Sequence, residues 1–170
     1  MNPLKALDDM RTIKRLLTEA ERIARETGEE EPSAEHLLLA AMVLPDGSAV
    51  RAFGSMGIDA NGIRAALLEE QADALVAVGI PRATAERLAA PEPLESGRAP
   101  LLYGAGTSAR EAFRTASDMA RAAKQRLAGA HVVAAVATIE RGTIARVLER
   151  LQVDRRQLAD AAARELGSSA

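Results

Sequence analysis

The feature of this sequence that most constrains its fold is an internal duplication around its two histidines. His36 and His131 each open an apolar run, and a constant spacing of 95 residues carries the first run onto the second. The same spacing aligns apolar, glycine and capping positions without a gap over about 35 residues. The aligned pairs are Ala40 and Ala135, Gly47 and Gly142, Ser48 and Thr143, Met56 and Leu151, Ile58 and Val153, Asp59 and Asp154, and Ile63 and Leu158. Two such copies predict a repeat architecture whose units bury their apolar faces against each other.

Each copy reads as a series of helices. Apolar residues recur at three- and four-residue spacing over residues 13–27, which is typical of an amphipathic helix, and Gly28 is a natural end for it. Residues 37–44 are apolar all round and predict a central helix. In the second copy the stripe from Phe113 to Ala123 lies one residue out of step, so the loop before His131 is one residue shorter. Ser108 and Glu111 precede that stripe at capping-box spacing.

The expected architecture is all-α, with two four-helix repeats. Abundant alanine favours helix over strand, and no sustained period-two alternation occurs. We expect one domain over residues 1–170, with repeat one at 9–70, a linker at 71–106 and repeat two at 107–166. A chain of 170 residues buries roughly 70% of its unfolded surface, so it needs neither metal nor disulfide to fold.

Composition removes several classes of function. The chain has no cysteine, which excludes disulfides, thiolate metal sites and cysteine nucleophiles. A net charge of −2 and an aromatic content of 2% argue against a nucleic-acid partner or an anionic membrane surface. No apolar stretch approaches the roughly 18 residues that span a bilayer, and no apolar leader opens the chain. We therefore expect a cytoplasmic protein.

A family resemblance rests on the residues around both histidines. Residues 33–40, Ser-Ala-Glu-His-Leu-Leu-Leu-Ala, are followed by Gly47 and by Met56-Gly57-Ile58-Asp59. This pattern resembles the amino-terminal domain of Clp-type AAA+ unfoldases, known as the Clp repeat domain. The second copy, Gly129-Ala130-His131-Val132-Val133 with Leu151-Gln152-Val153-Asp154, is a degenerate version. The resemblance covers roughly residues 9–166. Rough counterparts of residues 74–80 and 98–101 make the chain similar to stand-alone actinobacterial members.

The resemblance implies a fold, a function and a set of binding residues. The family has two four-helix repeats related by a pseudo-twofold axis, and its members receive substrates or adaptor proteins for an unfoldase–peptidase machine. The implied partners are proteins or peptides: a Clp unfoldase, its substrates or cyclic peptides. They would bind in the groove between the repeats, and the implied ligand-binding residues are Glu35, Lys14, Leu17, Leu101 and Tyr103.

In some members of the family the glutamate of this motif receives the guanidinium of a phosphorylated arginine. Glu35 keeps that carboxylate, whereas Ala34 replaces the threonine of the motif. Ala130 stands where the second copy would need its glutamate, so any such site is expected to be single.

Catalysis and cofactor binding find no support in the sequence. His36 and His131 could form a metal pair, but no third ligand stands at metal spacing, so we interpret both as structural histidines that hydrogen bond across the repeat interface. Residues 104–108 precede a helix but lack the lysine of a phosphate-binding loop, so no ATPase module is expected. We expect a non-enzymatic chain without a cofactor.

The alternative function is a helical DNA-binding regulator that uses residues 75–90. A turn with Gly79 precedes Arg82 and Arg87, which would lie on a following helix. Against this, the chain up to residue 107 has 11 basic and 17 acidic residues. Arg146, Arg150, Arg155 and Arg156 cluster later in the chain and are either a solvated face or a surface for an acidic partner.

Overall fold

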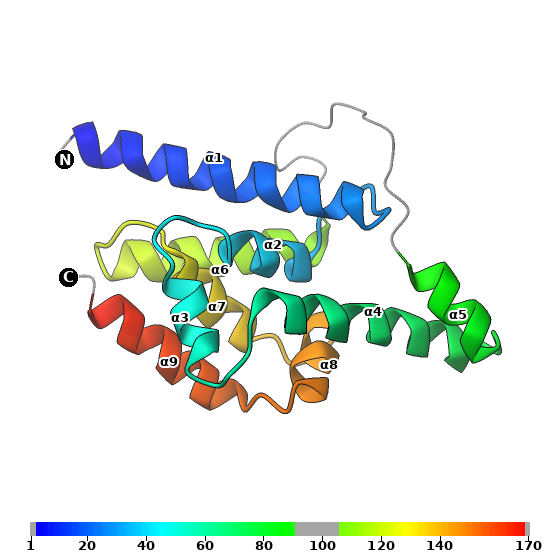
Figure 1. The fold of residues 1–170 in the computed structure, drawn as a ribbon. Helices are drawn as coiled ribbons and strands as arrows, with labels where there is room; N and C mark the ends of the chain where they lie inside the picture. Colours follow the sequence, from blue (N-terminus) through cyan, green and yellow to red (C-terminus); the bar gives the residue numbers. More distant parts are fainter. Residues whose placement is uncertain (1–2, 91–105, 169–170) are drawn as a thin grey trace.

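The computed structural model describes residues 3–90 and 106–168, shown in Figure 1. Within these two ranges the chain forms helices and no strand, as the sequence predicts. None of these helices is both long and apolar enough to cross a membrane. The helices are α1 (Pro3–Glu26), α2 (Ala34–Ala41), α3 (Ser48–Gly54), α4 (Ala60–Ala77), α5 (Arg82–Ala89), α6 (Thr107–Ala122), α7 (Gly129–Ala137), α8 (Thr143–Arg150) and α9 (Arg155–Gly167).

Two four-helix repeats, α1–α4 and α6–α9, make up the fold, and α5 stands between them. Gly47 before α3 and Gly142 before α8 both have positive φ, at 63° and 94°. The carboxylates of Asp59 and Asp154 cap α4 and α9 by accepting backbone N–H groups. The predicted duplication is therefore present in the order and capping of the helices as well as in the sequence.

The ends of α1 and α6 also correspond, at a spacing of 96 residues. Gly28 and Lys124 follow these helices with φ of 80° and 55°. The next residue in each copy donates its N–H back into the helix, Glu29 to Ala24 O at 2.8 Å and Gln125 to Ala120 O at 2.9 Å. This equivalence pairs Thr27 with Ala123 and Glu29 with Gln125. The shorter loop predicted before His131 is confirmed.

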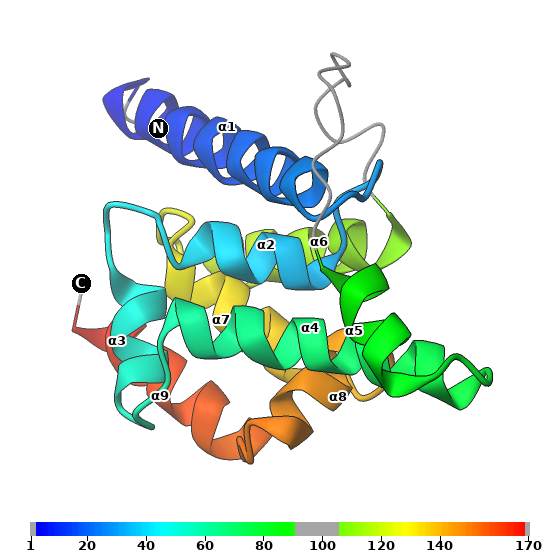
Figure 2. The same ribbon diagram turned by 45° about the vertical axis from the view of Figure 1, so that its right-hand side comes forward.

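The centre of the bundle is built from α2 and α7, whose apolar runs are buried on nearly every side. Figure 2 shows α1 on one side of the molecule, α8 and α9 on the opposite side, and α2, α6 and α7 between them. Neighbouring segments pack tightly at Gly129, where an added Cβ would lie 2.9 Å from Ala49 Cβ and 3.1 Å from Ala41 O. The glycine at this position lets α3 pack directly onto the start of α7.

Two helix boundaries differ from the sequence expectation. The first helix starts at Pro3, before residue 9 where repeat one was expected to begin, because proline suits the first helical position and no breaker follows it. The fourth runs on to Ala77, past the expected end of repeat one at residue 70. No glycine or proline interrupts it between Gly62 and Gly79.

Acidic residues of α4 bind basic residues of α8 across the repeats. Arg146 pairs with Glu70, and Arg150 pairs with Glu69 at 3.2 Å, Glu70 at 3.5 Å and with Asp73. Arg155 donates to Ile139 O at 2.8 Å. Three of the four clustered arginines thus serve contacts within the chain, and Arg146 and Arg150 hold the two repeats together. This corrects the interpretation of these two as a surface for an acidic partner.

Candidate functional site

A shallow groove runs between α1 and α6, the first helices of the two repeats. Leu17, Ala20 and Glu21 line it from α1. Ala109, Arg110 and Phe113 line it from α6, and Pro32 and Leu37 also border it. Leu17 and Phe113 are only partly buried although both pack against the core. The groove therefore has an apolar centre with one acidic and one basic residue at its edges.

Of the five sequence-predicted binding residues, Leu17 is the one in the lining of this groove. Leu17 lines it, and exposed Lys14 lies one turn earlier on α1. Glu35 lies in the first turn of α2 and is only 7% exposed. Leu101 and Tyr103 lie outside the described residues.

Ser108 connects the start of α6 to the start of α2. Its hydroxyl accepts the Ala34 N–H at 3.2 Å. The expected capping box of Ser108 and Glu111 is wrong, because Gly106 is the N-cap of α6 and Ser108 already lies inside the helix. The seryl hydroxyl bonds the other repeat instead of its own helix end.

His36 is fully buried and caps its own helix. Its Nδ1 accepts the Ser33 backbone N–H at 3.1 Å and lies 2.7 Å from Ser33 Oγ. The neutral ring therefore carries its proton on Nε2. That nitrogen lies 3.0 Å from Thr27 Oγ1, whose hydroxyl bonds the carbonyls of Ile23 and Ala24. Every polar atom of the ring has a partner, and burial lowers the pKa of His36 to about 4.

Glu29 adds a carboxyl group beside this histidine. Its Oε1 lies 3.7 Å from His36 Nε2 and accepts a hydrogen bond from Gln71 Nε2 at 3.3 Å. Burial raises the pKa of Glu29 to about 7, and the nearby Glu35 carboxylate adds to the shift. The start of α2 thus gathers two carboxyl groups, Glu29 and Glu35, beside one neutral histidine.

His131 repeats half of this arrangement. Its Nδ1 accepts the Ala128 backbone N–H at 3.1 Å, as His36 does with Ser33. Its Nε2 is buried and has no hydrogen-bond partner in the described part of the chain. Ala123 stands in the place of Thr27 and offers no hydroxyl. The sequence shows this exchange of Thr27 for Ala123 only when the residues before His131 are aligned at a spacing of 96 instead of 95.

Neither histidine bonds across the repeat interface, contrary to expectation. Near the histidines, three backbone N–H groups donate across the repeat interface instead. Ala34 N–H goes to Ser108, Gly129 N–H to Asp46 Oδ2 at 3.0 Å, and Ala130 N–H to Ser48 Oγ at 2.8 Å. Within the described ranges, no group of three or more histidine or carboxylate side chains is placed to hold a metal ion.

The alternative DNA-binding segment does form two helices around a turn. Arg82, the first residue of α5, pairs with Asp73 of α4 at 2.5 Å. Asp73 also binds Arg150, and exposed Glu86 lies one turn along α5. One of the two arginines proposed to read DNA is therefore held by a carboxylate of the preceding helix.

Comparison with known proteins agrees with this geometry. Residues 11–86 match the family model of the Clp repeat (R) N-terminal domain. The crystal structure of the N-terminal domain of the caseinolytic protease associated chaperone ClpD from Arabidopsis thaliana superposes with a TM-score of 0.60. The two are 20% identical, and the superposition covers 92% of each chain. No curated protein matches the sequence.

The class of protein follows from the fold and the family match together. Residues 11–86 match the Clp repeat N-terminal domain family, and the chain shares the helical fold of the ClpD N-terminal domain. The family match ends within α5, so the second repeat is assigned from the shared fold and from the correspondences of its turns.

Proposed function

We propose that this chain is a non-enzymatic protein-binding domain that receives protein or peptide segments for regulated proteolysis. The proposal rests on the groove between α1 and α6. Leu17 of repeat one and Phe113 of repeat two both line it. Partly exposed apolar side chains bordered by charged residues are typical of a peptide-binding surface. The likeness to a chaperone domain associated with a caseinolytic protease supports the same role.

The charged residues around the groove suit an extended peptide. An apolar side chain of the peptide would pack between Leu17 and Phe113. Glu21, Arg110 and Lys14 would meet polar groups at the rim, where charges set specificity more than affinity. Unfolded substrates and adaptor segments both supply such chains, and an unfoldase is the expected recipient.

A hydroxyl beside a histidine, Thr27 beside His36, does not make this a catalytic centre. Because His36 Nδ1 accepts a backbone N–H, its Nε2 holds the proton and cannot take one from Thr27. The ring is also fully buried, with 0% of its surface exposed. The pair is a structural hydrogen bond, which supports a non-enzymatic role.

Binding of fluorescein-labelled casein, an unfolded chain, tests the proposal by fluorescence anisotropy. Leu17→Ser and Phe113→Ser should each weaken binding roughly tenfold, since a central apolar contact contributes about 1–2 kcal/mol. Leu88→Ser is the matched control, because Leu88 is 61% exposed on α5, away from the groove. Equal affinity in all four proteins would place the binding elsewhere, and no binding by the wild type would remove the proposal.

Glu35 extends the proposal to the guanidinium of a phosphorylated arginine. A carboxylate accepts guanidinium N–H groups in charge-assisted bonds, and Ala130 offers no equivalent in repeat two. Calorimetric titration of free phosphoarginine should therefore show a single site that Glu35→Ala abolishes. Two equivalent sites in the wild type would contradict this assignment.

A further inference from the structure

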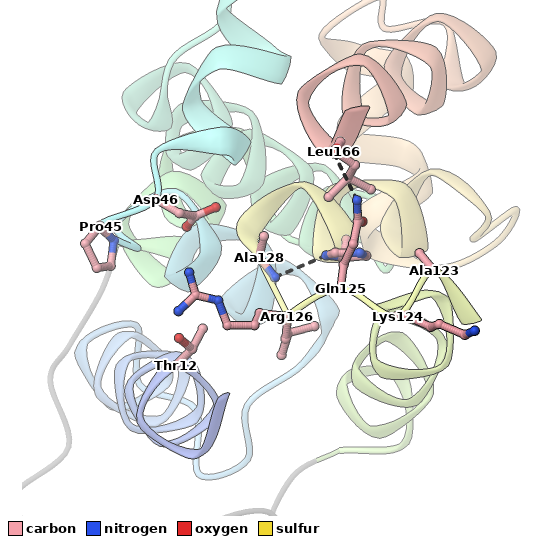
Figure 3. Close-up of a pocket in the computed structure, with 11 residues that line it drawn as sticks. Thr12, Pro45, Asp46, Ala123, Lys124, Gln125, Arg126, Ala128 and Leu166 are labelled. Carbon is pink, nitrogen blue, oxygen red and sulfur yellow. Dashed lines mark hydrogen bonds between the residues drawn. The ribbon is translucent and has the colours of Figure 1, made fainter. Parts of the chain in front are cut away.

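A second recess lies away from the α1–α6 groove and shares no residue with it. It is an open pocket of about 620 Å³ to which both repeats contribute. Figure 3 shows Thr12 of α1, the Pro45–Asp46 turn, residues 123–128 and Leu166 of α9 around it. His131 also lines it.

The imidazole ring of His131, which lines the pocket, has an unpaired donor of known protonation. His131 is 1% exposed, and its Nδ1 is occupied by the Ala128 N–H. The ring proton is therefore on Nε2, which is buried without a partner. Buried polar atoms of native proteins are nearly always hydrogen-bonded, so this N–H indicates an acceptor from beyond the described residues.

No described residue around the ring accepts a hydrogen bond from His131 Nε2. In repeat one the hydroxyl of Thr27 fills this position, whereas Ala123 has only a methyl group. Gln125, which corresponds to Glu29, donates its Nε2 to Leu166 O at 3.1 Å (Figure 3). That side chain is held by one hydrogen bond at the mouth of the pocket, so an entering group can displace it.

The charged side chains that line the pocket are of both signs: Asp46, Lys124 and Arg126. Arg126 pairs with Asp8 at 3.2 Å. Asp46 Oδ2 accepts the Gly129 N–H and the Ser48 hydroxyl. Pro45, Leu127 and Leu166 add apolar surface. A neutral group with an apolar substituent fits such a lining better than a carboxylate or an ammonium group.

We propose that this pocket binds an uncharged amide whose carbonyl oxygen accepts the His131 Nε2–H and whose apolar substituent packs on Leu127 and Leu166. The class of ligand is a peptide-like amide. The site is separate from the α1–α6 groove and stands or falls independently of it.

Imidazole ¹H–¹⁵N NMR tests the proposal, because the chain has only two histidines. The probes are N-acetyl-leucine amide, N-acetyl-leucine and leucine amide, which share a side chain and differ in charge. The neutral amide should shift the His131 Nε2–H signal with millimolar affinity, as expected for so small a fragment, and leave His36 unmoved. The charged probes should act at least tenfold more weakly.

Ala123→Thr gives His131 the hydroxyl that His36 already has. It should abolish the response to the neutral amide, while Phe113→Ser in the other groove should leave it unchanged. No shift at tens of millimolar of the amide, an equal shift by a charged probe, or a response that survives in Ala123→Thr would each overturn the proposal. A long-lived water on Nε2–H, undisplaced by the amide, would overturn it as well.

Discussion

The equivalent histidines of the two repeats, His36 and His131, have different surroundings. In both, Nδ1 accepts a backbone N–H and fixes the start of the central helix. On the far side of the ring, His36 meets Thr27, whereas His131 meets nothing within the described chain. The helix cap is thus the part of the motif that the fold requires. The partner of Nε2 differs between the repeats, and in repeat two His131 lines an open pocket.

A second difference lies at the first turns of the central helices. Ala34 opens α2 and Gly129 opens α7 at equivalent positions. Ala34 bonds Ser108 of α6, whereas Gly129 and Ala130 bond Asp46 and Ser48 beside α3. The start of α2 is thus held by α6, the first helix of repeat two. The start of α7 is held by residues at α3, the third helix of repeat one.

The largest effect on stability is expected from Gly129→Ala, which gives α7 the same first residue as α2. Gly129→Ala places a Cβ 2.9 Å from Ala49 Cβ and 3.1 Å from two backbone atoms that cannot move away freely. We expect it to lower the free energy of unfolding by about 2–3 kcal/mol, measured by urea denaturation. Gly54→Ala is the control, since an added Cβ there has no neighbour within 4 Å. Equal stability of the two variants would show that α3 does not pack on α7 as described.

Removing the hydroxyl that distinguishes the histidines should have the next largest effect. Thr27→Val keeps the shape of the side chain but leaves the His36 Nε2–H without its acceptor. A buried unpaired donor costs about 1–3 kcal/mol, so thermal and urea unfolding should both report a loss of that size. Thr27→Ser, which keeps the hydroxyl, should stay close to the wild type. A Val variant as stable as the Ser variant would remove Thr27 as the partner of His36.

The pH dependence of stability should separate Glu29 from its counterpart Gln125. The pKa of Glu29 is raised by burial to about 7, so the folded state holds a proton that the unfolded state releases above pH 4.5. The carboxyl group therefore costs stability as pH rises from 4.5 to 7. Glu29→Gln should gain about 1 kcal/mol at pH 8 and nothing at pH 4, allowing for solvent at a side chain that is 36% exposed.

Glu30→Gln is the matched control for that experiment, since it removes the same charge from an exposed neighbour. The lowered pKa of His36 acts in the opposite direction, stabilising the fold as pH rises from about 4 to 6.5. His36 is present in both proteins, so the difference between them isolates Glu29. A gain that is the same at pH 4 and pH 8 would contradict the raised pKa.

The smallest effect is expected at the turns before α4 and α9. Gly57 and Gln152 occupy equivalent positions with φ of 72° and 55°. Gln152→Gly should raise stability by about 0.5 kcal/mol, because relief of the left-handed conformation exceeds the extra freedom of the unfolded chain. Gly57→Gln should change it in the opposite direction. Identical signs in both exchanges would mean that the turns are not equivalent.

Much of this fold could be predicted because it depends on local patterns. The apolar run of α2, Gly28 at the end of α1 and Asp59 before α4 each determine a nearby backbone feature. The one-residue shift before His131 was also visible, since alanines of the first helices align only at the longer spacing.

The details that depend on distant packing were not predictable. Ser108 stands at capping-box spacing but bonds Ala34, 74 positions away in the chain. Arg146 and Arg150 look like a free basic surface until α4 extends past residue 70 and brings Glu70 and Asp73 beside them. The unpaired Nε2 of His131 follows from a substitution eight residues earlier, and only the folded loop shows that nothing else fills the gap.

Both histidines cap their own helices through Nδ1, and the two rings differ in the partner of Nε2. Long-range ¹H–¹⁵N NMR of the wild type tests this arrangement directly, because two histidines give two sets of imidazole signals. At pH 7 both rings should be neutral with the proton on Nε2, and His36 should stay neutral down to about pH 4. A ring with its proton on Nδ1, or a His36 that titrates near its ordinary pKa of 6.5, would contradict the account.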